Sequence, residues 1–597
     1  MIKKSVICSL LSLLIVVAIV FTPLVSAETI RGIRKIHVGA LAVTKEGEGD
    51  IIEFNLWVTP GKGRLILLGN KGLLAEDVVA SLNFSTWMAA RIAGVYHDNY
   101  DYYVEYTDTS SVEGLSATLL FTLAFLVLLR GDPWDENATA TGLIAPSGIV
   151  GNVSGIDEKY DAAVKYGYKR ILTPVYPKLL GKAHYKPVVS IIDSYEVFAL
   201  TPLYPKYDPA LEKLLLNKSS VLNGMFYSSW RYFYNKSIEI LDYIDDNIGI
   251  IHGLDLDKYY KSGYISINES KDYVEKGLYY TAASRAFYGY WVLNTVYIYI
   301  KCVNENIDPS MFIKDYEEIL NEFNNTLTSY VKDVDNISLY DLDVLINVYE
   351  RLFDSIESYN LSKGILARGI RNENDLIYFA SNISYAIARI DTARQWMELT
   401  KRGSDVITIR TEALEKTIKN EYGLLRAFAL FLKSLGFTDV CEYVQDLLSR
   451  KWFWSNNIVL LSRIIWIERD LSNFLLSVPQ YTVLSSLVRE GIRTSVVRML
   501  EYFDLYSGEI MPSAYTALEF YSTSEEYGVA PLSTSMLHML VLHEITSMKE
   551  QIILEPAQYT LPWLYVDKIV LFSMILIILG SFIIGYAIGI YGRKSIE

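Results

Sequence analysis

Histidine and positive charge are both scarce in this chain of 597 residues, and each scarcity excludes a class of function. The six histidines have no spacing typical of metal ligands: no His-Glu-x-x-His motif occurs, and His538 and His543 are five positions apart, off a shared helix face. The sequence therefore excludes a zinc peptidase of that type and predicts no metal or organic cofactor. Acidic residues outnumber Lys and Arg by 69 to 55, and the net charge of −14 argues against a nucleic-acid binder.

A phosphate-binding loop is missing as well. No Gly-x-x-x-x-Gly-Lys-Ser/Thr motif occurs anywhere in the sequence. Pro60–Gly63 contains the pair Gly-Lys, but it is predicted to be a hairpin turn that joins two strands. The sequence therefore predicts no ATP binding.

Cysteine is also rare, with three residues. Cys8 lies in an apolar N-terminal segment, which leaves Cys302 and Cys441 in the body of the chain. A disulfide between these two is permitted outside the cell, and two buried free thiols are the alternative.

The first apolar run of the chain indicates export. Residues 1–27 begin with Lys3 and Lys4, continue with an apolar stretch and end with the small residues Ser26 and Ala27, after which cleavage is expected. This is the pattern of a cleaved signal peptide, and an uncleaved membrane anchor is the alternative.

A second apolar run lies near the C-terminus. Residues 566–590 are long enough to form a single transmembrane helix. Arg593 and Lys594 in the tail 591–597 favour a cytoplasmic C-terminus, so the body, residues 28–563, is expected outside the cytoplasm at the cell membrane. Ten Asn-x-Ser/Thr sequons make glycosylation of that body an expectation.

Between these ends, two regions differ in pattern. Residues 33–203 alternate between strand and helix patterns and predict an α+β domain, whereas residues 209–554 have the long amphipathic patterns of a helical domain. The helical domain is interpreted as an irregular bundle, with a helical-repeat solenoid as the alternative. The expected strands are Lys35–Thr44, Asp50–Thr59, Arg64–Leu68, Tyr102–Tyr106, Thr139–Ile144, Ile149–Val150 and Arg170–Pro174. The expected helices of the first region are Leu74–Val95, Ser116–Leu129 and Ile156–Tyr166.

Two short motifs in the α+β region carry chemistry. Glu113–Ala117 places Ser116 between a loop and an apolar helix, where unpaired backbone N–H groups can stabilise an oxyanion. Ser154–Lys159 places Lys159 in the first turn of the next helix, and the lysine can accept a serine proton if burial and the helix N-terminus lower its pKa. Each motif alone is weak evidence, because most serines at helix starts are caps and most lysines there are solvated.

The order and spacing of these motifs resemble the proteolytic domain of the Lon family over residues 36–200. The family's nucleophile motif, Asp/Glu-Gly-Pro-Ser-Ala-Gly, is similar to Glu113–Thr118, and its lysine motif, Gly-Gly-Ile-x-Glu-Lys, is similar to Ser154–Lys159. The serine and the lysine are 43 residues apart, and no gap is needed against the family pattern. The other matching segments are Val38–Val43, Val58–Gly63, Thr141–Gly142, Ala162–Gly167 and Arg170–Pro174.

The resemblance implies a Lon-type fold and a role for each residue of the site. Ser116 would be the nucleophile and Lys159 the general base and later the acid. Thr141 would help to orient the lysine, and the main chain of Gly114, Leu115 and Ser116 would hold the oxyanion.

The chain departs from the family pattern around the dyad. Leu115 replaces a proline and Thr118 a glycine, Leu143 stands where a glutamate is common, and Asn152 and Ser154 replace a proline and a glycine. These changes put the shape of the loop and the substrate preference in doubt, but they leave the serine and the lysine in place.

The combined expectation is an ATP-independent serine endopeptidase that cleaves unfolded or flexible proteins or peptides outside the cytoplasm. A hexamer is expected by analogy with the family. The alternative is an inactive Lon-fold protein that serves as a cell-surface binding or scaffold module.

Overall fold

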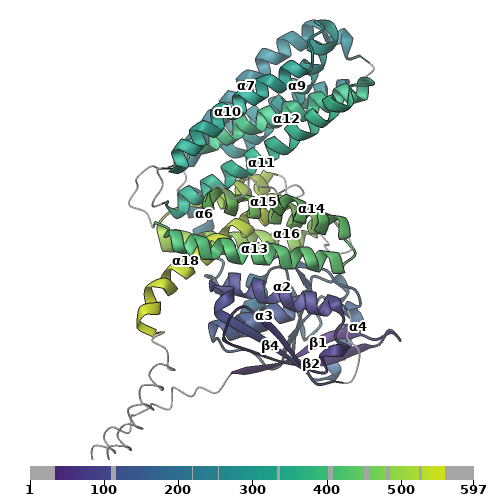
Figure 1. Ribbon diagram of the computed structural model, residues 1–597, viewed down its shortest axis with the longest axis vertical. Helices are drawn as coiled ribbons and strands as arrows, with labels where there is room; N and C mark the ends of the chain where they lie inside the picture. The colour runs from purple at the N-terminus through teal and green to yellow at the C-terminus, as the bar shows by residue number, and fades with distance from the viewer. Residues whose placement is uncertain are drawn as a thin grey trace, which may run out of the picture.

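The computed structural model describes residues 34–558, except for a set of short internal segments, and the molecule has three parts (Figure 1). An α/β domain lies at one end, a block of helices packs against it, and a rod of long helices continues beyond the block. The segments that are not described are 109–113, 115, 218–219, 253–254, 333–336, 401–407, 450–455, 479–484 and 524–527.

The α/β domain is built on a four-stranded sheet. Its strand order is β1 (Lys35–Val43), β2 (Gly49–Pro60), β4 (Tyr100–Tyr106) and β3 (Leu65–Gly69). β2 pairs antiparallel with both β1 and β4, and β3 runs parallel to β4. Leu41 and Ile51 on one face pack with Ile156 and Tyr160 of a later helix. On the opposite face, alternate residues of β1 and β2 are buried, among them Ile36, Val38, Phe54 and Leu56.

Two helices cover that face. α3 (Thr118–Arg130) packs on β1 and β2, and α2 (Glu76–Ala93) packs on α3. Phe54 of β2 meets Phe121 of α3 edge to face, with ring centroids 5.2 Å apart. α3 is buried almost all round, which explains why its sequence is nearly continuously apolar.

The predicted hairpin at Pro60–Gly63 is wrong, because β4 lies between the two strands that it was expected to join. The loop instead crosses the end of β4 and is held there by Asp101. The Asp101 carboxylate accepts hydrogen bonds from the Lys62 amide at 2.8 Å and the Arg64 amide at 3.0 Å. The Arg64 guanidinium pairs with the same carboxylate, and its hydrogen bonds hold the pKa of Asp101 well below the usual range.

Asp101→Ala is expected to lower the free energy of unfolding by about 2–3 kcal/mol, because two backbone N–H groups lose their acceptor. The folded state stabilises the ionised carboxylate of Asp101, and this is why its pKa is depressed. The contribution of Asp101 to stability is therefore present at neutral pH and is lost as the pH falls below about 4. Urea unfolding of the two proteins measures the difference. Asp161→Ala, at an exposed position, is the control, and an equal effect of both substitutions would contradict this account.

Two smaller sheets complete the domain. β5 (Ala138–Ala140), β8 (Arg170–Pro174) and β9 (Tyr185–Val188) form a parallel sheet, and β6 (Leu143–Ile144) pairs antiparallel with β7 (Val150–Gly151). The single strand expected over Thr139–Ile144 is therefore divided between two sheets. The two further helices of the domain are α4 (Ile156–Lys165) and α5 (Ile191–Ala199).

The strands and helices expected in this domain are confirmed apart from that division and that turn, but β9 and α5 were not predicted. α5 begins with a capping box in which Ser190 and Asp193 exchange hydrogen bonds.

The remaining described elements are helical, and the helices of the rod and of the block run in different directions (Figure 1). The helices from α6 to α12 are α6 (Pro209–Asn217), α7 (Ser220–Asp246), α8 (Leu256–Glu275), α9 (Tyr279–Asn304), α10 (Ser310–Lys332), α11 (Leu339–Arg368) and α12 (Glu373–Met397). The helices after α12 are α13 (Thr411–Ser434), α14 (Thr438–Ser449), α15 (Asn457–Ser477), α16 (Ser486–Ser507), α17 (Pro512–Thr523) and α18 (Val529–Gln558). Short 3-10 helices span Lys71–Leu73, His97–Asn99, Pro177–Leu179 and Ile248–Ile250.

Helices α7 to α12 form the rod, and α6 and α13 to α18 form the block (Figure 1). The block joins the α/β domain through α2, which packs against α13 and α18. Gly423 of α13 allows this close approach, because a Cβ there would lie 2.3 Å from the Trp87 ring. At the centre of the junction, Arg91 of α2 is 1% exposed and pairs with Glu421 of α13 and Glu468 of α15. A buried arginine thus holds two carboxylates that come from the other part of the chain.

The expected fold class, an α+β domain followed by a helical domain and a C-terminal transmembrane helix, needs correction. Helices dominate the described residues as a whole, and the strands in them are confined to residues 35–188. No helix among these residues is long and apolar enough to cross a membrane. The very apolar α3 has only 13 residues, whereas about 20 are needed, and the longer helices carry polar positions at intervals. Residues 1–27 and 566–590, on which the signal-peptide and transmembrane predictions depend, lie outside the described residues.

The two cysteines of the body are free thiols. Cys302 lies on α9, half-buried, and Cys441 lies on α14, buried. Of the two alternatives that the sequence left open, the disulfide is therefore wrong.

Candidate active site

Ser116 lies in the turn that precedes α3, and the main chain around it is tied to the loop between β5 and β6. The carbonyl oxygen of Ser116 accepts hydrogen bonds from the Thr141 hydroxyl at 3.0 Å and from the Gly142 amide at 2.8 Å. In return, the Leu119 amide donates to the Gly142 carbonyl at 3.1 Å. These bonds fix the position of the turn at the start of α3.

Lys159 lies on α4, and its side chain is buried at 4% exposure. α4 begins after Gly155, whose φ of +67° favours glycine, and a Cβ there would lie 2.6 Å from Val43. Burial lowers the pKa of Lys159 to about 8, and the nearby Glu158 carboxylate opposes that shift in part. A sizeable fraction of this amine is therefore neutral near pH 8.

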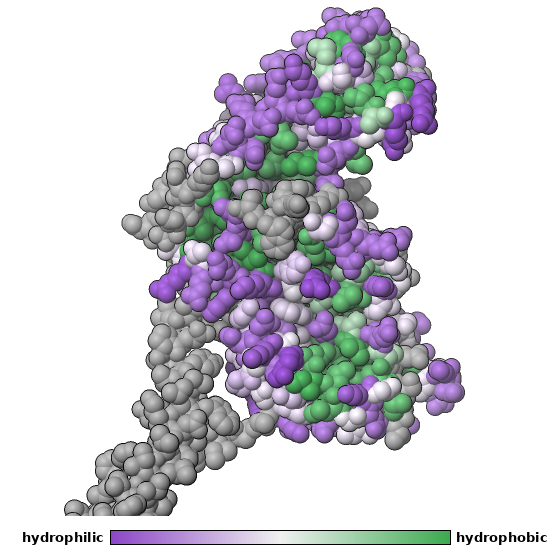
Figure 2. All heavy atoms as spheres, viewed as in Figure 1, coloured by the Kyte–Doolittle hydropathy of each residue, from purple (hydrophilic) through white to green (hydrophobic). Residues whose placement is uncertain are grey.

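Ser116, Lys159 and Gly114 line one cavity of about 330 Å³. The structure thus brings together two motifs that are 43 residues apart in the sequence. The rest of the lining is largely apolar and comes from β1, β2, α2, α3, the segments around β6 and β7, and the end of α13. On the face drawn in Figure 2, apolar residues gather over the middle of the α/β domain, whereas the rod is mostly hydrophilic.

The three predicted supporting residues differ in what the structure shows of them. Leu115 lies outside the described residues. The Gly114 amide donates to the Asp77 carboxylate at 2.7 Å, so this N–H group already has an acceptor. The fully buried Thr141 donates its hydroxyl to the Ser116 carbonyl, and so supports the turn of the serine. The predicted role of Thr141 toward the lysine, and the oxyanion role of this main chain, stay predictions.

Two residues that the sequence did not single out belong to this site. Asp77, in the first turn of α2, holds the Gly114 amide. Leu435 follows α13 in the helical block and lines the same cavity as Ser116. No local motif marks either residue, because both act through contacts between distant parts of the chain.

A serine at a helix start and a buried lysine in one cavity can together perform acyl transfer. The serine oxygen would be the nucleophile, and the neutral amine would be the base that accepts its proton. In the part of the chain that the structure describes, no group of three or more metal-ligating side chains lies close enough to hold a metal ion.

Comparisons with known proteins agree with this class of site. Residues 24–178 match the family described as the Lon protease (S16) C-terminal proteolytic domain. The Archaeal Lon protease of Pyrococcus abyssi is 29% identical over 185 residues, which are 30% of this chain and 17% of that protein. The Archaeal Lon protease of Archaeoglobus fulgidus is 30% identical over 23% of this chain and 22% of its own length. The Lon protease of Halothermothrix orenii is 32% identical over 22% of this chain and 18% of its own.

The chain thus spans between about a sixth and a quarter of the length of these relatives. The similarity covers the N-terminal part of the chain and indicates a serine peptidase domain of the Lon type there.

Proposed function

We propose that the chain is a serine endopeptidase that uses Ser116 and Lys159 as a dyad and cleaves unfolded or flexible polypeptides without ATP. The observation that carries the proposal is the shared cavity of a serine at a helix start and a buried lysine whose pKa is lowered to about 8. The similarity of residues 24–178 to the Lon proteolytic domain supports the same assignment.

The reaction follows from these two groups. The neutral Lys159 amine takes the Ser116 proton while the serine oxygen attacks the scissile carbonyl carbon. The resulting ammonium then gives the proton to the leaving amine as the C–N bond breaks and an acyl-enzyme forms. A water molecule, deprotonated by the same lysine, hydrolyses the ester and restores both residues.

The cavity supports a preference for apolar side chains beside the cleaved bond. Its lining includes Leu41, Phe54 and Phe121, and Leu435 of the helical block closes part of it. A side chain of a substrate that enters this space leaves water for an apolar surface. Because no phosphate-binding motif occurs in the sequence, the proposal requires substrates that are already extended.

The test is cleavage of casein by the purified chain without ATP. Ser116→Ala should remove the activity, because it removes the hydroxyl that attacks the scissile carbonyl, and Ser154→Ala, the other serine of the lining, should keep it. Ser228→Ala, at an exposed position of α7 outside this cavity, is the control and should cleave normally. Cleavage that survives in Ser116→Ala would exclude this serine as the nucleophile. If the wild type shows no cleavage but binds a specific surface partner, the scaffold alternative is favoured.

The rate of cleavage is expected to rise with pH around a midpoint near 8. Below this pH the amine of Lys159 is mostly protonated and cannot accept the serine proton, and above it the amine is mostly neutral. The measurement is kcat/KM for a peptide of casein between pH 6 and pH 10. A profile that is flat over this range would contradict the lysine base.

Other parts of the proposal rest on the sequence and on family analogy. They are the location outside the cytoplasm, which protease protection in intact cells would test, and a six-membered ring, which analytical ultracentrifugation would test.

A further inference from the structure

A second cavity, of about 430 Å³, lies among the helices where the rod meets the block. Helices α9, α11, α12, α15, α17 and α18 all contribute side chains to it. Its size falls within the range of small-molecule sites, about 300–1,000 Å³. Its walls carry Arg351, Arg389 and Arg469 together with several carboxylates, amides and hydroxyls.

Two of the three arginines have carboxylate partners inside the protein. Asp354 pairs with Arg389 at 3.2 Å and with Arg469 at 2.8 Å. Glu350 lies 3.7 Å from Arg469 and 3.3 Å from His538, and the carboxylates raise the pKa of His538 to about 9 against the effect of its burial. Asp470 also pairs with Arg469, at 2.8 Å, and Asp343 lies 3.4 Å from His538, so each of these cations has at least one carboxylate partner.

Arg351 has no such partner. Its guanidinium donates to the Asn347 carbonyl at 2.8 Å and to the Asn347 side-chain oxygen at 3.1 Å, and it stacks on Trp396 at 4.0 Å. Neither neighbour is an anion, and no carboxylate of the described residues forms an ion pair with it. Burial lowers the pKa of Arg351 to about 10, which still leaves it protonated at neutral pH. Glu350 and Asp354 line the same cavity and partly oppose that lowering of the pKa, but Arg351 is the arginine of this lining with which no described carboxylate forms an ion pair.

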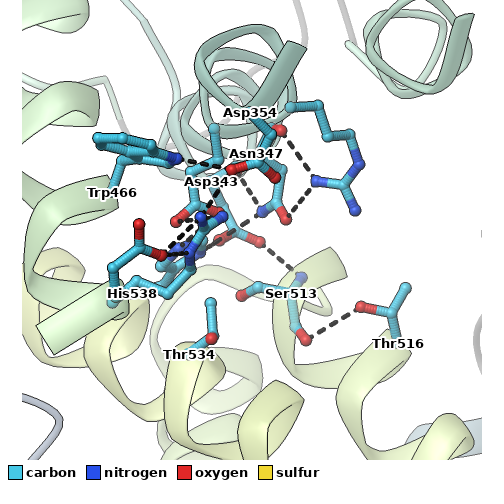
Figure 3. A network of polar contacts seen from close by, with 12 residues as sticks. Asp343, Asn347, Asp354, Trp466, Ser513, Thr516, Thr534 and His538 are labelled. Carbon is cyan, nitrogen blue, oxygen red and sulfur yellow. Dashed lines mark hydrogen bonds and ion pairs between the residues drawn. The ribbon is translucent and has the colours of Figure 1, made fainter. Parts of the chain in front are cut away.

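Hydroxyl groups on the opposite wall lack hydrogen-bond partners. Ser513 of α17 and Ser535 of α18 are 5% and 1% exposed, and neither hydroxyl has a partner among the described residues. Figure 3 shows Ser513 and Thr534 facing Asn347 and Asp354 of α11. A buried hydroxyl without a partner destabilises the folded state, and a polar ligand in the cavity would remove that cost.

We propose that this cavity binds a small polar ligand that carries a carboxylate or phosphate group. The Arg351 guanidinium pairs with the oxyanion, since its planar fork matches both groups, and the Ser513 and Ser535 hydroxyls donate to the same ligand. The site is separate from the Ser116 cavity and does not depend on the proposed peptidase activity.

Isothermal titration calorimetry of the full chain with inorganic phosphate, and separately with citrate, at constant ionic strength tests the proposal. Saturable binding of at least one of them is expected, and the tighter one identifies the preferred group. Arg351→Gln should weaken this binding by at least about tenfold, because the charge-assisted hydrogen bonds are lost. Arg371→Gln, at an exposed position before α12, is the matched control and should bind as the wild type does.

The proposal is overturned if neither phosphate nor citrate binds saturably, or if Arg351→Gln binds as tightly as the wild type. Should Arg351→Gln fail to fold, the double variant Ser513→Ala and Ser535→Ala takes its place. Each of these substitutions removes only a hydroxyl that makes no bond within the described residues. Weaker binding by several-fold is then expected, and unchanged affinity would overturn the proposal.

Discussion

Lys159→Met is expected to lower kcat/KM for casein by at least about a thousandfold while the protein stays folded. Methionine has nearly the length of lysine and suits a buried position, but it has no amine to accept the serine proton. The loss is therefore chemical and not structural. Casein cleavage, together with circular dichroism to confirm the fold, measures it.

Lys165→Met provides the matched control for this prediction. Lys165 lies on the same helix, α4, but it is exposed and is not part of the cavity. The Lys165→Met protein should cleave casein at nearly the wild-type rate. If Lys159→Met retained activity within about tenfold of the wild type, the lysine would not be the base, and a Ser116-only mechanism would have to be sought.

The second large effect is expected at the junction of the α/β domain with the helical block. Arg91→Met should lower the free energy of unfolding by about 3–5 kcal/mol, because Glu421 and Glu468 are then left as buried carboxylates without their cation. Arg91 also donates to the Pro146 carbonyl at 2.7 Å, and that bond is lost as well. Urea unfolding measures the change.

Arg231→Met, at an exposed position of α7, is the control and should change stability by less than about 0.5 kcal/mol. The triple variant Arg91→Met, Glu421→Met and Glu468→Met separates two explanations. It should recover part of the stability, because an apolar replacement of a buried ion network is often tolerated, and the neighbouring Glu544 keeps the hydrogen bond that Asn420 donates to it at 2.6 Å. A loss in the triple variant as large as in Arg91→Met would show that the unpaired carboxylates are not the cause.

The sequence predicted the α/β domain well where local patterns decide the structure. The alternating apolar positions of β1 and β2 reflect the face of the sheet that α3 covers. The continuous apolar run of α3 reflects a helix that is buried almost all round. β9 escaped prediction because it is a four-residue strand that contains Pro187, and the hairpin was wrong because β4, forty residues later, inserts between its strands. Strand insertion is a property of the assembled sheet, which no local pattern records.

For the active site, the sequence indicated Ser116 and Lys159 through their motifs, and the structure places both in one cavity. It could not indicate Leu435, which reaches the cavity from the helical block, or Arg91, whose partner Glu421 is 330 residues away. These contacts depend on how distant helices pack, and a single sequence contains no local signal for that.

The packing of α2 on the helical block bears on where this protein can be divided. Phe84 of α2 is fully buried, and its ring lies 5.0 Å from Phe428 and 5.4 Å from Phe431 of α13. A fragment that ended at residue 203 would expose Phe84 to water together with the charged Arg91. The change of sequence pattern near residue 203 is therefore not the edge of an independent folding unit, since the peptidase region and the helices share one hydrophobic core.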